Sequence, residues 1–182
     1  MRISCQISLA CAVTIHFLFD STSLPGMSPS FTQNRHRAGF LLVTLQFALL
    51  ALLAALAMPA LWHGHLPVAA GVLAALSMAL AGWTLAHNQL GNFNIHPAPK
   101  TDGVLVTSGP YRLIRHPMYS AVLLGGAAMA WLSEPWLAWP AWCALAGVLW
   151  VKARLEEHWV SEHHARYADY CKTSKRFVPW VV

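Results

Sequence analysis

Residues 39–61 read GFLLVTLQFALLALLAALAMPAL, a run of mainly Leu, Ala, Val and Phe that holds no charged side chain. A helix needs about 20 predominantly apolar residues to cross the hydrocarbon core of a bilayer. The length and composition of this run therefore predict a transmembrane helix. The remainder of the chain is interpreted around that helix.

The composition of the whole chain also indicates a membrane protein. Of the 182 residues, 57% are hydrophobic and only 10% are Asp, Glu, Lys or Arg, against roughly 25% charged residues in soluble domains. Intrinsic disorder is excluded because it requires low hydrophobicity and high charge. An ordinary soluble globule is disfavoured because so few charges cannot cover its surface. The net charge of +5 does not indicate nucleic acid, because membrane proteins concentrate basic residues in their cytoplasmic loops.

Further apolar segments follow at residues 68–86, 117–132 and 136–151. With residues 39–61 they predict an all-α fold, a polytopic bundle of four transmembrane helices. Residues 152–182 are polar and form the predicted C-terminal cytoplasmic segment, so that residues 39–182 make one membrane domain.

The N-terminal residues 1–38 allow three interpretations. Their apolar part is interrupted by Ser, Gln, Thr and His, which fits a weak fifth span or a signal-like segment. Alternatively, translation starts at Met27 and the residues before it are an extension outside the mature protein.

The positions of the basic residues predict the topology. The turns near residues 62–66 and 133–135 hold no Lys or Arg. Apart from Arg2, every Lys and Arg falls on the other side of a four-span arrangement, which the positive-inside rule assigns to the cytoplasm. The central loop and the C-terminal segment are therefore expected to face the same compartment. The predicted location is a bacterial inner membrane with the site on its cytoplasmic side.

Two groups of residues carry the chemistry. In the central loop, Arg115 and His116 stand at the mouth of a span, and Pro117 suits the first turn of the helix. In the C-terminal segment, Lys152 and Glu156 are four residues apart and would face each other on a helix. Glu157 would then lie on a different face of the helix from Glu156, so that one carboxylate points into a pocket and the other is exposed to solvent. Taken alone, each group also fits ordinary anchoring at the membrane interface.

The two groups together resemble a known enzyme family. The chain is similar to the isoprenylcysteine carboxyl methyltransferases in four successive stretches. These are Gly-Pro-Tyr111-Arg112-x-x-Arg115-His116-Pro117-x-Tyr119, Arg154-x-Glu156-Glu157, Tyr167-x-x-Tyr170 and Arg176-Phe177-Val178-Pro179. That family belongs with the membrane phospholipid methyltransferases. The resemblance covers roughly residues 90–182, and it departs from the family's pattern at His163-His164, where Phe-Gly is common.

The resemblance implies an integral-membrane methyltransferase that uses S-adenosylmethionine (SAM). The acceptor would be small or lipid-like and partitioned into the bilayer, with a carboxylate, thiol or amine as the methylated group. The resemblance implies Arg154 as the substrate-side residue, and we expect His116 and Glu157 to act in catalysis with it. The implied cofactor-binding residues are Gly103, Val104, Leu105, Val106, Tyr111, His116 and Glu156, with Glu157 as the alternative to Glu156. Arg115 and Tyr119, from the same motif, are expected to contribute to the cofactor site.

Physical chemistry suits these roles. A Glu can bind the ammonium or ribose hydroxyls of SAM, an Arg or backbone amides its carboxylate, and Tyr faces attract the sulfonium cation. A carboxylate or thiolate acceptor needs no general base. A protonated amine does, and His116 or Glu157 would supply it.

Two other functions are alternatives for this sequence. One is an NADPH-dependent membrane reductase of the sterol or steroid type, and the other is a non-catalytic membrane protein that binds haem or a partner. The ten His residues include His63-x-His65, which has no third ligand nearby, so no metal site is expected. The four Cys residues form no CxxC pair and are given no role.

Overall fold

The computed structural model describes residues 29–88, 106–133, 135–163 and 167–179. Within these ranges the chain is helical, which confirms the all-α prediction there. The elements, in order, are α2 (Pro29–Trp62), α3 (Val68–His87), the 3₁₀ helix η2 (Gly109–Arg112), α4 (Pro117–Leu132), α5 (Pro135–His163) and α6 (Tyr167–Thr173). In the described part of the chain, strand-like pairing is confined to one parallel bridge between Ile114 and Lys175.

Three helical segments are long and apolar enough to cross a membrane: Arg37–Trp62, Val68–His87 and Trp136–His158. Helix α4 is apolar but has only 16 residues, which span about 24 Å at 1.5 Å per residue. The hydrocarbon core of a bilayer is about 30 Å thick. Three of the four predicted spans are therefore present at full length, and α4 is a shorter apolar helix. The weak fifth span expected before residue 28 lies outside the described residues.

Two helix ends differ from the predicted boundaries. Helix α2 begins at Pro29, ahead of the predicted start at residue 39, and α5 continues to His163 rather than ending at residue 151. The sequence of α5 from residue 148 to 163 contains no Gly or Pro, and many of its residues are good helix formers. The second functional motif therefore lies on the same continuous helix as the last span.

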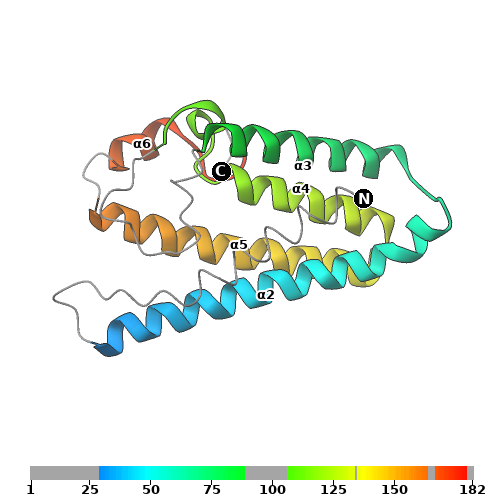
Figure 1. Cartoon of the computed structure of the whole chain (residues 1–182), viewed down its shortest axis with the longest axis horizontal. Coiled ribbons are helices and arrows are strands. Elements are labelled where there is room, and N and C mark those ends of the chain that lie inside the picture. The colour runs from blue at the N-terminus through cyan, green and yellow to red at the C-terminus, as the bar shows by residue number, and fades with distance from the viewer. Residues whose placement is uncertain (1–28, 89–105, 134, 164–166, 180–182) are drawn as a thin grey trace.

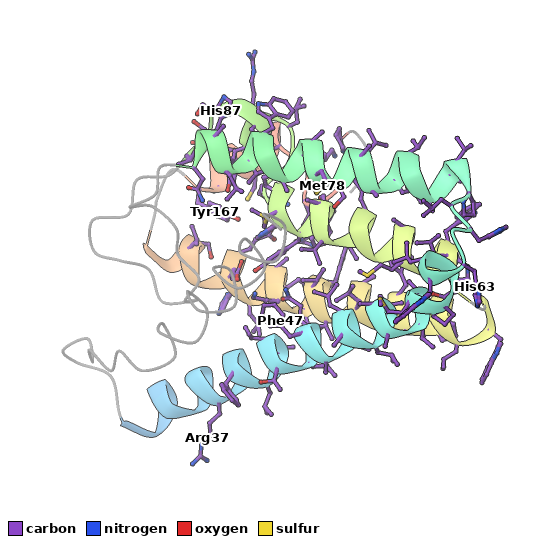
Figure 2. All side chains as sticks on the ribbon, turned by 45° about the vertical axis from the view of Figure 1, so that its right-hand side comes forward. Arg37, Phe47, His63, Met78, His87 and Tyr167 are labelled. Carbon is purple, nitrogen blue, oxygen red and sulfur yellow. The ribbon has the colours of Figure 1, made fainter. Side chains whose placement is uncertain are left out.

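The helices pack as two neighbouring pairs (Figure 1). Helix α3 lies along α4 and α2 lies along α5, while α4 also contacts α2 and α5. The start of α2 and α4, the end of α3 and α5, and all of α6 gather at one end of the bundle. Figure 2 shows Arg37, His87 and Tyr167 toward this end and His63 at the opposite end. We call the first of these the motif end.

Small residues allow α4 to approach its neighbours closely. A Cβ at Gly125 would lie 3.0 Å from Ser77 Oγ of α3, and one at Gly126 would lie 3.1 Å from Leu145 Cδ2 of α5. Ser77 Oγ donates a hydrogen bond to the Ala121 carbonyl at 2.7 Å, and Trp142 Nε1 donates to the carbonyl of Leu123 at 2.9 Å. Small residues and interhelical hydrogen bonds of this kind are typical of helices that associate within a bilayer.

The apolar side chains are distributed as expected for a bundle in lipid. A core of Leu53, Leu145 and Leu149 is fully buried between α2 and α5. Many other large apolar side chains are exposed on the outer surface, including Phe47 and Met78 (Figure 2). A continuous exposed apolar surface marks contact with a membrane or a partner, and the span lengths favour the membrane.

Candidate functional site

The loop that leads to α4 is shaped by one glycine. Gly109 has a backbone φ of +59°, a region that L-residues with a Cβ rarely adopt. A Cβ at this position would also overlap the imidazole ring of His87, which lies at the end of α3. Gly109 therefore allows η2 to dock directly against α3. The loop is tied to α6 as well, because Tyr170 Oη donates a 2.5 Å hydrogen bond to the Tyr111 carbonyl.

The C-terminal segment, residues 174–177, folds back along residues 113–116. The Arg115 amide donates to the Lys175 carbonyl at 2.7 Å, the His116 amide to the Arg176 carbonyl at 3.1 Å, and the Lys175 amide to the Leu113 carbonyl at 3.1 Å. These three bonds place the residues before α4 beside a segment some sixty positions later in the chain. They also satisfy backbone groups that would otherwise stand unpaired at the end of the bundle.

Glu157 is the centre of an ion-pair cluster. Arg115 Nε donates to its Oε1 at 2.8 Å, and Arg176 donates to its Oε2 through Nη2 at 2.5 Å and through Nε at 3.0 Å. His116 Nε2 lies 3.3 Å from the same Oε1. Two guanidinium groups and an imidazole thus converge on one carboxylate. Bidentate Arg–carboxylate geometry of this kind is both strong and directional.

The expectation that one of the two carboxylates meets solvent is wrong. The side chain of Glu157 is 12% exposed and that of Glu156 is 21% exposed. Successive residues on a helix point about 100° apart, so the two do face different ways. The reason that neither reaches water freely is the C-terminal segment, which covers the side that Glu157 faces and supplies Arg176 to it.

Glu156 has different partners. Tyr119 Oη donates a 2.5 Å hydrogen bond to its Oε1, and His116 Nδ1 lies 3.8 Å from its Oε2. The rings of His116 and Tyr119 are stacked, with centroids 5.2 Å apart and planes within 2°. His116 therefore stands between the two carboxylates, one at each ring nitrogen. Among the described residues, the hydrogen-bond and ion-pair partners of Glu156 are Tyr119 and His116, and no guanidinium joins them.

Lys152 departs from its expected partner. Its Nζ lies 3.4 Å from Gln46 Oε1 of α2 and 5.0 Å from the ring centroid of Tyr119, in place of the predicted pairing with Glu156. The i,i+4 spacing permits that pairing, but Glu156 already accepts the Tyr119 hydroxyl. Gln46 was missed by sequence reasoning. A lone amide inside an otherwise apolar span was the signal that could have identified it.

Aromatic side chains surround the cluster. The Arg176 guanidinium lies 4.8 Å from the Trp150 ring centroid, in a cation–π arrangement. Phe177 is buried and contacts the rings of Trp150, His116 and Tyr119, with centroids 5.8, 5.9 and 6.4 Å away. Sequence reasoning missed the role of Trp150, which precedes the charged motif and reads as one more apolar residue of the span.

Tyrosines at the motif end keep their protons. Burial, and then the nearby charge of Glu156, raises the pKa of Tyr111 above its usual value. Burial raises the pKa of Tyr170 to about 12. Desolvation disfavours the charged phenolate, so both side chains remain neutral hydroxyl groups throughout the physiological pH range.

The remaining predicted residues lie apart from this cluster or outside the described residues. Arg154 is exposed on α5, about 200° around the helix from Glu156, and its substrate role stays a prediction. Val106 is partly buried ahead of η2. Gly103, Val104 and Leu105 lie outside the described residues. Among the residues that the structure describes, no group of three or more His, Cys, Asp or Glu side chains could hold a metal ion.

Two curated relatives are named for metal resistance. The cobalt-zinc-cadmium resistance protein CzcN of Cupriavidus metallidurans is 31% identical over 150 residues, which cover 80% of this chain and 64% of that protein. The nickel-cobalt-cadmium resistance protein NccN of Alcaligenes xylosoxydans xylosoxydans is 27% identical over 147 residues, 80% of this chain and 65% of that protein. The chain thus spans slightly less than two thirds of either relative. No solved structure matches significantly.

A family model described as phospholipid methyltransferase matches residues 66–167. This range is more than half of the chain and contains α3, η2, α4 and α5. It includes both groups of residues from which the sequence resemblance was drawn. The chain belongs to the phospholipid methyltransferase family.

Proposed function

We propose that this protein transfers a methyl group from SAM to a small or lipid-like acceptor that is partitioned into the membrane. The observation that carries the proposal is the meeting of His116 and Tyr119, from the start of α4, with Glu156, near the end of α5. The family match supports methyl transfer. The narrower resemblance to isoprenylcysteine carboxyl methyltransferases makes a carboxylate acceptor one candidate, beside thiols and amines.

The residues of the motif end suit the chemical groups of SAM, which supplies an electrophilic methyl group on a sulfonium. Glu156 accepts one hydroxyl hydrogen bond and retains acceptor capacity for an ammonium or ribose hydroxyls. Tyr111 offers a ring for adenine, and the face of a Tyr ring also attracts a cation such as the sulfonium. Methyl transfer by direct displacement depends mainly on positioning and desolvation, which a partly buried, aromatic site favours.

We assign different roles to the two adjacent carboxylates. Glu156 is proposed as the cofactor ligand because its contacts are a neutral hydroxyl and an imidazole. Glu157 is proposed as a positioning residue because two guanidinium groups already neutralise it, which makes it a poor proton acceptor. If the acceptor is an amine that must lose a proton, His116 is therefore the favoured base. Arg154 stays the proposed substrate-side residue.

Binding of SAM by the full-length protein in detergent tests the proposal. Calorimetry should detect SAM binding to the wild type, and Glu156→Gln should weaken it about tenfold or more, since a hydrogen bond to a charged group contributes roughly 1.5–3 kcal/mol. The matched control is Asp169→Asn, which removes an exposed carboxylate that forms a salt bridge with Lys172 on the same helix. The control should bind SAM as the wild type does.

The same assay separates the alternatives. Wild-type protein that ignores SAM but is stabilised by NADPH would contradict the proposal and favour a membrane reductase. A haem absorption band in the purified protein would favour the non-catalytic alternative. Neither alternative receives support from the family match or from the two relatives.

We propose a bacterial inner membrane as the location, with the motif end facing the cytoplasm. The Lys and Arg positions of the described residues fall on the segments that gather at this end of the bundle: the N-terminal part of α2, η2 and the residues up to α4, the C-terminal half of α5, and α6 with the residues after it. The positive-inside rule assigns such an end to the cytoplasm, where SAM is available.

The names of the two relatives suggest a biological setting, resistance to divalent transition metals. We propose that this chain contributes to such resistance through methylation of its membrane acceptor. A strain that lacks the protein should grow less well on cadmium or zinc, and wild type but not Glu156→Gln should restore growth. Full restoration by the Gln variant, expressed at equal level, would separate any resistance role from methyl transfer.

A further inference from the structure

Lys152 and Gln46 form a polar pair inside the apolar bundle. Lys152 lies on α5 and Gln46 on α2, and their side chains meet with Nζ and Oε1 3.4 Å apart. Gln46 is buried, at 8% exposure. A cation and an amide within a membrane bundle are expensive, and such residues usually belong to a functional site. The proposed cofactor ligands do not include either residue.

The depth of this pair can be estimated from the two helices. Sixteen residues separate Gln46 from Trp62 at the far end of α2, and sixteen separate Lys152 from Trp136 at the far end of α5. Both side chains thus stand roughly 24 Å from the aromatic residues at the opposite interface. In a hydrocarbon core about 30 Å thick, this places the pair just inside the inner edge, near the headgroups of bilayer amphiphiles.

Ordinary snorkelling does not explain the direction of Lys152. A snorkelling Lys extends its ammonium along the helix toward water. The Lys152 ammonium instead lies beside Gln46, which is at the same depth, and over the Tyr119 ring at 5.0 Å. Within the described residues Lys152 forms no direct ion pair, and Glu156, one turn away, acts on it only through its charge while accepting the Tyr119 hydroxyl. The direct contacts of the ammonium are the Gln46 amide oxygen and the Tyr119 ring.

The pair also adjoins the proposed cofactor ligands. Tyr119 contacts the Lys152 ammonium through its ring and Glu156 through its hydroxyl. A group held by Lys152 would therefore lie next to the side chains that are proposed to bind SAM, on the side that faces α2.

We propose that Lys152 and Gln46 bind a singly charged anionic group of the methyl acceptor and thereby select anionic amphiphiles. The inference rests on the proposed function. The ammonium would neutralise the charge, and the Gln46 amide N–H would donate a hydrogen bond. The anionic group is either a carboxylate or a phosphodiester, since both carry one negative charge at the depth of the headgroups.

A carboxylate bound here could itself be the nucleophile. One carboxylate oxygen would form the new O–C bond to the methyl carbon as the S–C bond breaks. The sulfur keeps the electron pair and becomes a neutral thioether, and no proton is released. A phosphodiester bound here would instead anchor the acceptor while another of its groups reacts.

The test uses the full-length protein in a neutral detergent, saturated with S-adenosylhomocysteine. The ligands are N-dodecanoylglycine, its uncharged methyl ester, and lysophosphatidylglycerol, and the readout is the concentration that half-saturates the rise in melting temperature. We expect N-dodecanoylglycine, lysophosphatidylglycerol or both to stabilise the wild type, and the ester to do so far less. The pattern distinguishes a carboxylate from a phosphodiester.

Variants then assign the preference to the pair. Lys152→Met should raise the half-saturating concentration of the anionic ligand about tenfold or more, and Lys152→Arg should restore most of the affinity. Gln46→Leu is the second variant, with a smaller expected loss. Lys172→Met is the matched control, because Lys172 is exposed and pairs with Asp169, and it should behave as the wild type does.

The possible results distinguish failure of the proposed function from failure of the acceptor assignment. If the wild type does not bind SAM in the calorimetric assay, the proposed function fails whatever the amphiphiles do. If SAM binds but the anionic ligands are not preferred over the ester, only the acceptor assignment fails. A preference that survives unchanged in Lys152→Met would likewise overturn it, and would leave Lys152 as an interhelical contact.

Discussion

At the scale of single residues, the central feature is that two adjacent carboxylates have unlike surroundings. Glu157 is held by Arg115 and Arg176, whereas Glu156 accepts a hydroxyl from Tyr119. His116 lies between them. The spacing of the charged residues predicted that the two would face different ways, but not which would be neutralised. That depends on Arg176, which is distant in sequence and reaches Glu157 only when the C-terminal segment folds back.

Because of this difference, we expect one conservative substitution to lower the melting temperature and the other to weaken SAM binding. Glu157→Gln should lower the melting temperature markedly, because it leaves two partly buried guanidinium groups without a counter-charge, at a cost of about 2–4 kcal/mol. Glu156→Gln should leave the melting temperature close to that of the wild type while SAM binding weakens about tenfold or more. Thermal unfolding in detergent, with calorimetry on the same samples, measures both. Equal melting temperatures for the two variants would contradict the positioning role of Glu157.

At the scale of elements, the C-terminal segment is as important as the helices. Residues 174–177 hydrogen-bond to residues 113–116, and Ser120 Oγ donates to the Phe177 carbonyl at 2.6 Å. The segment is short and carries no helical or strand periodicity, so sequence reasoning could identify its Arg-Phe pair only through the resemblance. The three long spans were predictable because length and hydropathy decide them. A helix around Lys152 and Glu156 was expected as well, but the sequence did not indicate that it would continue the last span as one helix, α5.

Removing one side chain should loosen this segment. Arg176→Ala loses the pairing with Glu157 and the contact with Trp150, while its backbone carbonyl still accepts from His116. Hydrogen exchange followed by mass spectrometry should show faster exchange of the Arg115 and His116 amides in this variant. Lys175→Ala is the control, since its side chain is exposed and its backbone bonds do not require it. If the control and Arg176→Ala exchange alike, the ion pair does not hold the segment in place.

At the scale of the whole molecule, the positions of the basic residues and the directions of the helices indicate the same arrangement of the two ends of the bundle. Three full spans and the shorter α4 place the start of α2 and the end of α5 at the motif end, and the turn at His63 at the other end (Figure 2). The sequence predicted this arrangement from its four apolar segments together with the distribution of Lys and Arg. The apolar segment predicted at residues 117–132 has the same bounds as α4, but its 16 residues are fewer than a full crossing of the bilayer needs.

The orientation can be checked with single cysteines introduced into a chain whose four native Cys are replaced by Ser. His63→Cys, in an exposed turn, should react in intact cells with a membrane-impermeant maleimide. Lys172→Cys, exposed on α6, should react only after the membrane is permeabilised. The reverse pattern would place the motif end outside the cytoplasm and would remove its access to SAM.

The unbroken course of α5 has a consequence for which acceptors can react. Twenty residues separate Trp136 from Glu156 on one helix, a rise of roughly 30 Å, about equal to the thickness of the hydrocarbon core. Because the last span and the motif belong to one unbroken helix, the height of the proposed reacting groups above the bilayer centre is set mainly by residue count. An amphiphile would not react if its nucleophilic atom lay well above the glycerol level or deep among the acyl chains, because that atom would be at a different depth from the reacting groups. The depth of the nucleophilic atom in the membrane would then determine which acceptors are methylated, independently of the charge or the shape of the acceptor.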